Sequence, residues 1–450
     1  MLLGKTVHHD EDFIFPKNNL LRHSVMLGNS GCGKTVASKV IVEEALLSGI
    51  PVIAVDPQGD ISSMGFQVDN DKWSSVESVV WTPASNAGVP VCLDPLIYSE
   101  LQNLTPEDQC KAISAMSKSL VELVSPKSKR KDDVEAYLDL CLQWIVGNRV
   151  SITRMEDFVS FLEETNPVLE EHVSKVITSS LRADIIKKFH IMLTGSSKLL
   201  FSYGRALSID DLITPCEPGK TRLSVLYLNG LQSEEEKAFF INRLLYKIYN
   251  WMLKNPATEP QLLFYMDEVA PYIPPVRITA CKRYFDLLLR QGRKYGVCAL
   301  LSTQNPGDID YKVLSQVSNW FLGKLITSQD LKKVENAIRS NTSRVDAIIT
   351  SLPRLQPGYF HCISSSAQKP ELIKFRMCYT RHETLCETDI QEIQPPAGLK
   401  TAISKQDLFD IPLFSEEKPR RSCYRSKKLP HSFEAQLEQV FEGIKLKVSI

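Results

Sequence analysis

Residues 28–35 read GNSGCGKT and fit the pattern G-x-x-x-x-G-K-[ST] of a phosphate-binding loop without a gap. Glycine lets backbone N–H groups turn towards a triphosphate, where a Cβ would block the approach. Lys34 would contact the β and γ phosphates, and Thr35 would place its hydroxyl on Mg²⁺. We therefore predict that ATP and Mg²⁺ bind at this loop. The residues predicted to contact the nucleotide are Gly28, Asn29, Ser30, Gly31, Cys32, Gly33, Lys34, Thr35 and Val36.

A second group of candidate residues follows two later apolar segments. The run LLFYMDE (262–268) ends in Asp267 and Glu268, which places two carboxylates at the exposed tip of a buried strand. Asp267 would hold Mg²⁺ through water, and Glu268 would orient or deprotonate the attacking water. Gln304 ends the segment VCALLSTQ, and its amide could sense the γ-phosphate or position water. The alternative for Gln304 is a hydrogen bond to the backbone at the end of a strand.

Two arginines are candidates for neutralising charge on the transferring phosphoryl group. Phosphoryl transfer benefits from a guanidinium that is often supplied by a neighbouring subunit. Arg22 precedes the first strand on the side away from its own nucleotide loop, and Arg293 follows the helix after the Asp-Glu pair. A surface salt bridge is the alternative for each.

The segments around the glycine loop have the pattern that the motif requires. The apolar segment 23–27 predicts a buried strand, and residues 35–49 have helical spacing that ends at Gly49, a favourable C-terminal cap. Residues 50–56 predict a second buried strand that ends at Asp56. A strand, a glycine loop, a helix and a strand in this order favour a phosphate site at a helix N-terminus.

The rest of the chain predicts an α/β core interrupted by helices. Residues 106–124, 133–147 and 155–164 have apolar residues at helical spacing, whereas apolar strands return after residue 220 and a β-hairpin closes the core near 358–377. We predict a mainly parallel central sheet with an all-α insertion. The expected parts are the first core segment (1–103), the helical insertion (104–200), the second core segment (201–383) and a C-terminal tail with a basic stretch and a final helix (384–450).

The 450-residue chain has a formal net charge of zero, so we expect no attraction of its whole surface to nucleic acid. A net charge of zero does not exclude a local basic channel that binds nucleic acid. One candidate for such a channel is the segment with Lys127, Lys129, Arg130 and Lys131. This segment is either a solvated loop or a contact to DNA phosphates. The second lies in the tail, with Arg420, Arg421, Arg425, Lys427 and Lys428.

The eleven cysteines include no CxxC pair, and we find no signal peptide, which together predict reduced thiols and a cytoplasmic protein. No apolar run approaches the ~20 residues that span a bilayer, so we expect no integral membrane segment. Cys32 is interpreted as a filler in its loop rather than a nucleophile.

Four stretches in this order resemble the HerA branch of the HerA–FtsK superfamily: RHSVMLGNSGCGKT, VIAVDPQGDIS, LLFYMDE, and the segment from LLRQGRKYG to WFLGKL. The resemblance runs from about residue 20 to 385 and implies a RecA-like ATPase that translocates double-stranded DNA as a homo-hexameric ring. By the family pattern, the residues that carry over directly are Lys34, Thr35, Asp267, Glu268 and Gln304. Arg22 matches an arginine that acts on a neighbour's nucleotide, and Arg293 matches the Gly-Arg pair after the acidic strand.

The family's usual N-terminal β-barrel finds no room in the 20 residues before the first strand, which bears on how a nuclease or other effector would dock. Two alternatives to a DNA translocase or helicase stay open. One is a pump ATPase of conjugation or secretion, which would need a membrane anchor or membrane partner. The other is a nucleotide-gated scaffold that switches an effector without moving DNA.

Overall fold

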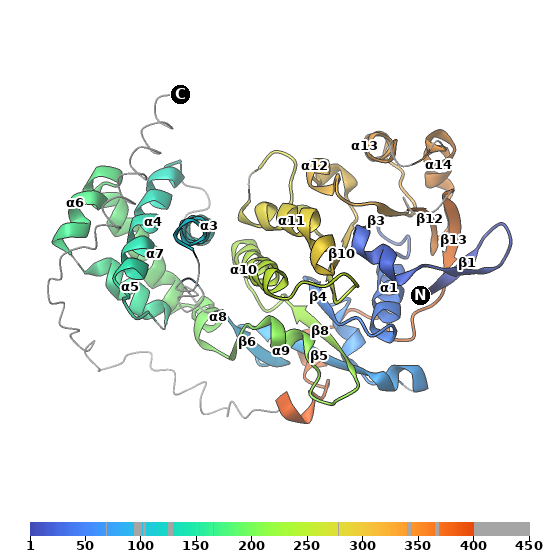
Figure 1. The fold of residues 1–450 in the computed structure, drawn as a ribbon, viewed down its shortest axis with the longest axis horizontal. Coiled ribbons are helices and arrows are strands. Elements are labelled where there is room, and N and C mark those ends of the chain that lie inside the picture. The colour runs from blue at the N-terminus through green and yellow to red at the C-terminus, as the bar shows by residue number, and fades with distance from the viewer. Residues whose placement is uncertain are drawn as a thin grey trace.

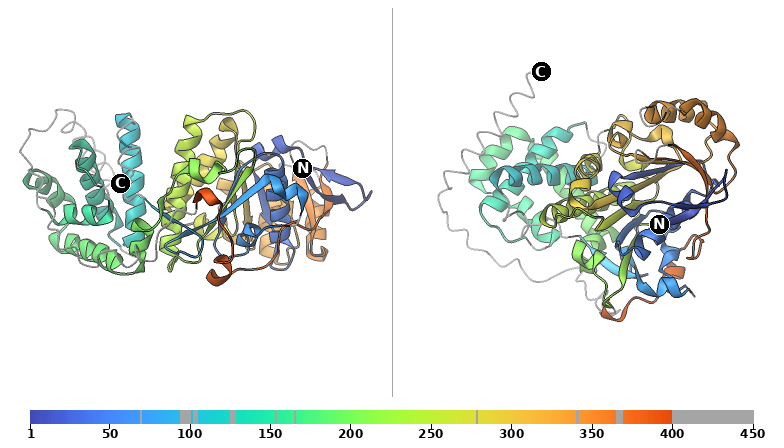
Figure 2. Two further views of the ribbon diagram at one scale, coloured as in Figure 1. Left: turned by 90° about the horizontal axis from the view of Figure 1, so that it is seen from below. Right: turned by 45° about the vertical axis from the view of Figure 1, so that its right-hand side comes forward.

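The computed structural model describes residues 1–399 apart from 69, 94–100, 102–104, 125–128, 153, 165, 278, 340–341, 343 and 365–368. One large sheet forms the centre of the molecule, helices cover both of its faces, and a group of helices stands at one side (Figures 1 and 2). Among the described residues, none of the helices is long and apolar enough to cross a membrane.

The sheet has the strand order β2-β1-β13-β12-β11-β3-β10-β9-β4-β8-β5-β6-β7. Its strands are β1 (Leu2–Thr6), β2 (Asp12–Ile14), β3 (Ser24–Leu27), β4 (Val52–Asp56), β5 (Val76–Pro83), β6 (Val89–Cys92), β7 (Arg205–Ala206), β8 (Thr221–Tyr227), β9 (Leu262–Met266), β10 (Val297–Thr303), β11 (Asn319–Leu322), β12 (Tyr359–Ser364) and β13 (Glu371–Phe375). All pairs from β11 through β3 to β7 are parallel, and the pairs from β11 outwards to β2 are antiparallel. The predicted mainly parallel α/β sheet is confirmed.

The α-helices are α1 (Lys34–Leu47), α3 (Pro106–Val124), α4 (Lys131–Gly147), α5 (Met155–Glu163), α6 (Pro167–Val176), α7 (Ser179–Thr194), α8 (Leu199–Ser202), α9 (Ile209–Ile213), α10 (Glu234–Lys254), α11 (Ala280–Gln291), α12 (Tyr311–Leu314), α13 (Ser328–Ile338), α14 (Val345–Ser351) and α15 (Glu387–Ile390). Short 3₁₀ segments that matter below are η1 (Lys17–Arg22), η5 (Ala270–Tyr272), η6 (Gly292–Tyr295) and η7 (Pro306–Asp308).

The central strands β3, β9, β10 and β4 are buried along their whole length. Alternate residues of a strand face opposite sides, so each strand contributes to two cores. Val25 and Leu27 belong to the core that contains α10 and α11, and Met26 belongs to the core that contains α1. Because these strands are parallel, their carboxyl ends meet at one edge of the sheet, where loops can hold a ligand.

The antiparallel side contains the predicted hairpin and two strands that the sequence did not reveal. β12 and β13 pair with Tyr359 opposite Lys374, as the closing hairpin requires. The N-terminal residues form β1, which pairs with β13, and β2. Gly4 is needed in this pairing, because a Cβ there would lie 2.0 Å from the carbonyl oxygen of Lys374.

Residues 376–381, which follow β13, pack against α1, the helix after the glycine loop. Arg376 forms ion pairs with Glu43 and Glu44 of α1, both at 2.8 Å. Thr380 donates its N–H and its hydroxyl to Glu43, at 2.8 and 2.9 Å. Lys39 donates to the carbonyl of Arg381 at 2.9 Å. The charged side chains of α1 thus find hydrogen-bond and ion-pair partners inside the protein. Because of these partners, α1 can be buried on nearly all sides although it carries charged residues.

The helices α3 to α7 form the group to the left in Figure 1, on the side of the sheet where β6 and β7 lie. Helix α3 contacts the core through α10, where Asn242 donates a hydrogen bond to Ser119. It also contacts α11, because the Glu122 carboxylate accepts from the N–H of Ala280 at 2.9 Å. These contacts connect the helical group to the same face of the sheet that α10 and α11 cover.

The four-part division of the chain stays a proposal. Leu385 and Ile390, which lie beyond the expected end of the second core segment, are buried, and the Leu385 N–H donates to Gly59 at 3.0 Å. The basic tail stretch and the predicted final helix lie outside the described residues.

Candidate nucleotide site

The glycine loop leaves β3 and enters α1 in the geometry that its sequence predicts. Gly31 and Gly33 have φ values of 76° and 87°, in the left-handed region that glycine adopts without strain. Gly33 occupies the N-cap of α1, and no side chain caps that end of the helix. The first N–H groups of α1 are therefore directed at the space beside the loop, as an anion site at a helix N-terminus requires.

Hydrogen bonds from three neighbouring segments fix the loop. The N–H of Gly28 donates to Thr303 at 3.4 Å, and the N–H of Asn29 donates to Lys324 at 2.9 Å. The Cys32 carbonyl accepts from Gly358 at 2.8 Å. A Cβ on Gly33 would lie 2.9 Å from the nitrogen of Gly358, so the loop needs glycine here for packing as well as for φ.

The side chains at the end of the loop differ in burial. Lys34 is buried at the start of α1, and Thr35 and Val36 are partly exposed beside it. Cys32 is buried, and this burial raises the pKa of its thiol, which disfavours the thiolate that a nucleophile needs. The observation agrees with the interpretation of Cys32 as a filler.

Asp267 and Glu268 follow β9 at the same edge of the sheet, two strands from the glycine loop. Asp267 is 5% exposed and accepts a hydrogen bond from the Tyr265 hydroxyl at 3.2 Å. Glu268 has a φ of 54°, which non-glycine residues rarely adopt. This backbone turns the Glu268 carboxylate towards β10, the strand that lies between β9 and β3.

Thr303 and Gln304, at the end of β10, hold the Glu268 carboxylate. The Thr303 hydroxyl donates to Oε1 at 2.5 Å, and the backbone N–H of Gln304 donates to Oε2 at 3.1 Å. Because the Thr303 carbonyl also accepts from Gly28, this residue connects the acidic strand with the glycine loop. Sequence reasoning missed Thr303; its only signal was its place directly before Gln304 in the STQ tripeptide.

Asp56, at the end of β4, is a second missed residue. Its carboxylate is fully buried and accepts hydrogen bonds from the backbone of Gly59, Ile61 and Ser62 and from the Ser62 hydroxyl, at 2.7 to 3.0 Å. Burial, with the nearby Asp267 adding to it, raises the pKa of Asp56 against the effect of these donors. Asp56 thereby shapes the loop after β4, and its signal in the sequence was an acidic residue ending an apolar strand.

Arg22 and Arg293 lie at the opposite edge of the sheet. Arg22 ends η1 just before β3, and Arg293 lies in η6 just before β10. The seven residues of β10 span about 23 Å at ~3.3 Å each, farther than a side chain reaches. The structure therefore brings these two arginines near each other and away from the loop, Asp267, Glu268 and Gln304 of their own chain.

His23 packs between the two arginine-bearing segments. Its Nδ1 accepts a hydrogen bond from the N–H of Ala299 at 3.1 Å, and burial lowers the pKa of His23 to about 4, which keeps the ring neutral at physiological pH. A Cβ on Gly292 would lie 2.7 Å from the Val297 carbonyl and 3.2 Å from the His23 ring. The glycine of the Gly-Arg pair is thus required by close packing.

The basic segment between α3 and α4 is described only in part. Lys127 and the five basic residues of the tail lie outside the described residues. Lys129 and Arg130 are exposed, and Arg130 forms an ion pair with Asp133 at 2.7 Å. Lys131 begins α4 close to the Glu122 carboxylate. The role of this segment in DNA binding remains a prediction.

Comparison with solved structures shows the same fold. VirB4 of Thermoanaerobacter pseudethanolicus superposes with a TM-score of 0.58 at 14% identity, over 84% of this chain and 96% of that chain. The plasmid coupling protein TrwB, in complex with ADP and Mg²⁺, gives a TM-score of 0.54 at 13% identity, over 86% and 92% of the two chains. These similarities confirm the predicted RecA-like P-loop architecture.

Comparison of sequences identifies the family. A probable DNA double-strand break repair helicase HerA of Methanocaldococcus jannaschii is 20% identical over 83% of this chain and 75% of its own length. The HerA helicase of Sulfurisphaera tokodaii is 23% identical over 83% and 68%. The family model for the helicase HerA-like C-terminal region matches residues 3–352. The chain therefore belongs to the HerA family, as the resemblance of its motifs indicated.

Proposed function

We propose that this protein is an ATP-hydrolysing motor that translocates on or unwinds double-stranded DNA, working as a homo-hexameric ring in the cytoplasm, with a nuclease or another effector as a possible partner. The observation that carries the proposal is the position of Glu268. Its carboxylate lies at the edge of the sheet that carries the glycine loop. The Thr303 hydroxyl donates to this carboxylate at 2.5 Å and the Gln304 N–H at 3.1 Å. Family membership, with relatives described as DNA repair helicases, supports the DNA substrate.

The residues of the site fit a magnesium nucleotide. Gly31 and Gly33 hold the loop in a left-handed turn beside the N-terminus of α1, which no side chain caps, and Lys34 supplies a positive charge for phosphate oxygens. The Thr35 hydroxyl and the Asp267 carboxylate are oxygen ligands of the kind that Mg²⁺ prefers. When bound, the metal ion neutralises charge on the phosphates. TrwB, which shares the fold, binds ADP and Mg²⁺.

Glu268 acts on the attacking water in this proposal. A carboxylate held by two donors keeps one orientation, so its remaining lone pairs can accept a proton from a water molecule at a defined place. Gln304 contributes its backbone N–H to that orientation and leaves its side-chain amide for the γ-phosphate or the water. Within the described residues we find no hydrogen bond from this amide to the backbone, and its role at the nucleotide stays part of the proposal.

The arginines support a shared site. Because Arg22 and Arg293 lie at the amino edge of the sheet, neither can neutralise charge at the nucleotide of its own chain. A head-to-tail ring would bring the amino edge of one subunit to the carboxyl edge of the next. We propose that Arg22 is the group supplied in trans, with Arg293 as the second candidate.

The test is the ATPase rate of the purified protein with and without duplex DNA. A motor is expected to hydrolyse ATP faster with DNA, and the rate should depend on DNA length and fall at high salt. Glu268→Gln is the matched control, because it should bind DNA and ATP without turnover. A rate that duplex DNA does not change, at salt where DNA binds, would contradict the motor and favour the nucleotide-gated scaffold. Hydrolysis that requires membranes would favour the pump.

A further inference from the structure

Two loops leave the nucleotide edge and meet on the face covered by α11. One loop follows Glu268 through η5 to Ile273, and the other follows Gln304 through η7 to Asp310. They are joined where the N–H of Asp310 donates to the Ile273 carbonyl at 2.8 Å. A movement of either group at the nucleotide therefore reaches the same point.

Lys282 of α11 closes this junction. Its ammonium lies 2.5 Å from Asp310 Oδ2 and donates to the Pro274 carbonyl at 3.1 Å, so it holds residues of both loops. The two side chains are 20% and 12% exposed, which limits screening by solvent. Although burial acts to raise it, the hydrogen bond from Lys282 and the N–H of Lys312 hold the pKa of Asp310 below its ordinary value, so Asp310 is ionised at neutral pH.

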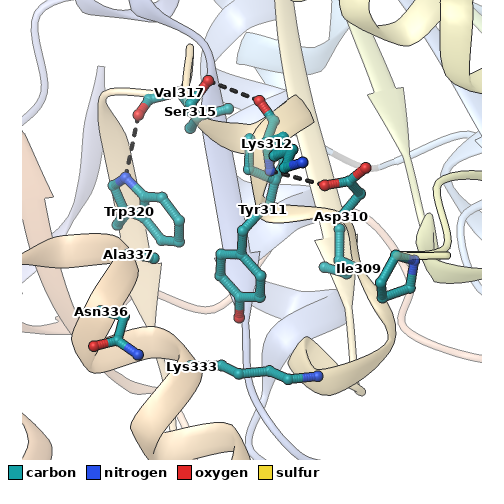
Figure 3. A pocket seen from close by; sticks show the side chains of 12 residues that line it. Ile309, Asp310, Tyr311, Lys312, Ser315, Val317, Trp320, Lys333, Asn336 and Ala337 are labelled. Carbon is teal, nitrogen blue, oxygen red and sulfur yellow. Dashed lines mark hydrogen bonds between the residues drawn. The ribbon is translucent and has the colours of Figure 1, made fainter.

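From Asp310 a short hydrogen-bonded segment leads to Arg22. Asp310 Oδ1 accepts the N–H of Lys312 at 2.9 Å and so begins α12, which lies along a cavity of about 620 Å³ (Figure 3). After α12, the Val317 carbonyl accepts from the buried Trp320 indole at 3.2 Å. The N–H of Ser318 then donates to the Arg22 carbonyl at 2.9 Å. Seven residues lie between Asp310 and Ser318, and three of them, Val313, Leu314 and Val317, are buried.

We propose that the Lys282–Asp310 ion pair is a positioning element that connects the two loops of one nucleotide site with Arg22, which acts on the nucleotide of the next subunit. The inference rests on the proposed function, because it needs Arg22 to act in trans. The pair lies outside the group of residues that contact the nucleotide in the proposed function. Its effect is on where the Arg22 backbone sits, and misplacement of a catalytic group by about 1 Å can cost on the order of 10² in rate.

The experiment uses mixed rings, in which each subunit type is inactive alone. Lys34→Ala subunits keep Arg22 and donate it, and Arg22→Ala subunits keep Lys34 and bind nucleotide. ATP hydrolysis recovered on mixing measures only interfaces between the two types. Lys282→Met, which keeps the aliphatic stem and removes the charge, is then introduced into one subunit type at a time.

We expect Lys282→Met in the arginine-donating subunit to lower the recovered rate about tenfold, although that subunit binds no nucleotide productively. In the nucleotide-binding subunit, the same change should alter the rate by no more than about twofold. Asp310→Asn, which keeps the acceptor for Lys312, should repeat this asymmetry, and Lys282→Arg should restore most of the rate. Asp310→Asn also serves as the test variant if Lys282→Met does not fold.

The control is the ion pair of the exposed Arg290 and the partly buried Asp286 at the other end of α11, with its atoms 2.8 Å apart. Asp286→Asn in the donating subunit should leave the recovered rate unchanged. Equal losses in both placements, or no loss in the donating subunit, would overturn the positioning role while leaving the shared site intact. No recovery from the parental mixture, in rings shown to be mixed, would overturn the shared site and this inference with it.

Discussion

The two edges of the central sheet differ in how their functional side chains are held. At the carboxyl edge, Lys34 and Asp267 are buried and Glu268 is bonded to two donors of its own chain. At the amino edge, Arg293 is exposed and Arg22 is only partly buried. The first edge is preorganised for a nucleotide bound by the same chain. Its side chains therefore need no rearrangement at the moment of reaction. In the proposed ring, the second edge would face the nucleotide of a neighbouring subunit. Under that proposal, one chain would carry two half-sites.

The largest expected effect comes from removing the charge at the carboxyl edge. Lys34→Ala should abolish nucleotide binding or turnover, because backbone N–H groups cannot replace a point charge on the β and γ phosphates. Nucleotide binding and ATPase assays check this, with Lys332→Ala on the exposed side of α13 as control. Turnover at the unaltered rate would show that Lys34 and its glycine loop take no part in ATP hydrolysis.

Glu268→Gln should separate binding from hydrolysis. The amide keeps the shape of the side chain and can still pair with Thr303, but it cannot act as a base, so the turnover number should fall by roughly 10²–10⁴. ATP affinity should change little, because Asp267 and the loop are intact. Titration of labelled nucleotide and a single-turnover assay measure the two quantities. Normal hydrolysis, or failure to bind ATP, would assign the role of Glu268 to another group.

Thr303→Val should sharpen the account of the carboxyl edge. Valine fills the same space but removes the hydroxyl that orients the Glu268 carboxylate, and we expect about a tenfold lower turnover number with unchanged ATP affinity. Ser302→Ala is the matched control, because the buried Ser302 hydroxyl has no hydrogen-bond partner in the described part of the chain. Equal effects of the two substitutions would show that Thr303 matters only for packing.

Smaller effects are expected outside both edges, first at the basic segment before α4. Replacing Lys127, Lys129, Arg130 and Lys131 with glutamine should weaken duplex binding and flatten its salt dependence, by ~0.9 in the logarithmic slope for each DNA phosphate that the protein no longer neutralises. Binding titrations at several salt concentrations measure this slope. An unchanged slope would show that the segment is solvated surface that does not contact DNA phosphates. The basic residues of the tail should give a still smaller change.

The parts of the site that lie within one local pattern could be predicted from the sequence. The glycine loop, the helix after it and the acidic end of β9 each follow from spacing over a few residues, and the fold of the core follows from the alternation of apolar strands and helices. Family resemblance added the order of these motifs and placed Arg22 and Arg293.

The remaining parts depend on contacts between distant residues. Thr303 became visible only when β10 lay beside β9, and the role of Asp56 required the folded loop after β4. The strand β1 was missed because it is short and pairs with residues near 374. The same holds for Arg376, whose partners on α1 precede it by more than 300 residues. No local spacing records such pairs.

The most direct test of the two half-sites is to mix Lys34→Ala subunits with Arg22→Ala subunits and measure ATP hydrolysis. Each type alone should be inactive, since an arginine in trans can be worth on the order of 10³ or more in rate. In a random equal mixture, about a quarter of head-to-tail interfaces would pair an intact loop with an intact Arg22, so about a quarter of the wild-type rate should return. Wild-type activity should also rise with protein concentration as rings form. No recovery in rings shown to be mixed, together with turnover that is independent of concentration, would contradict the account.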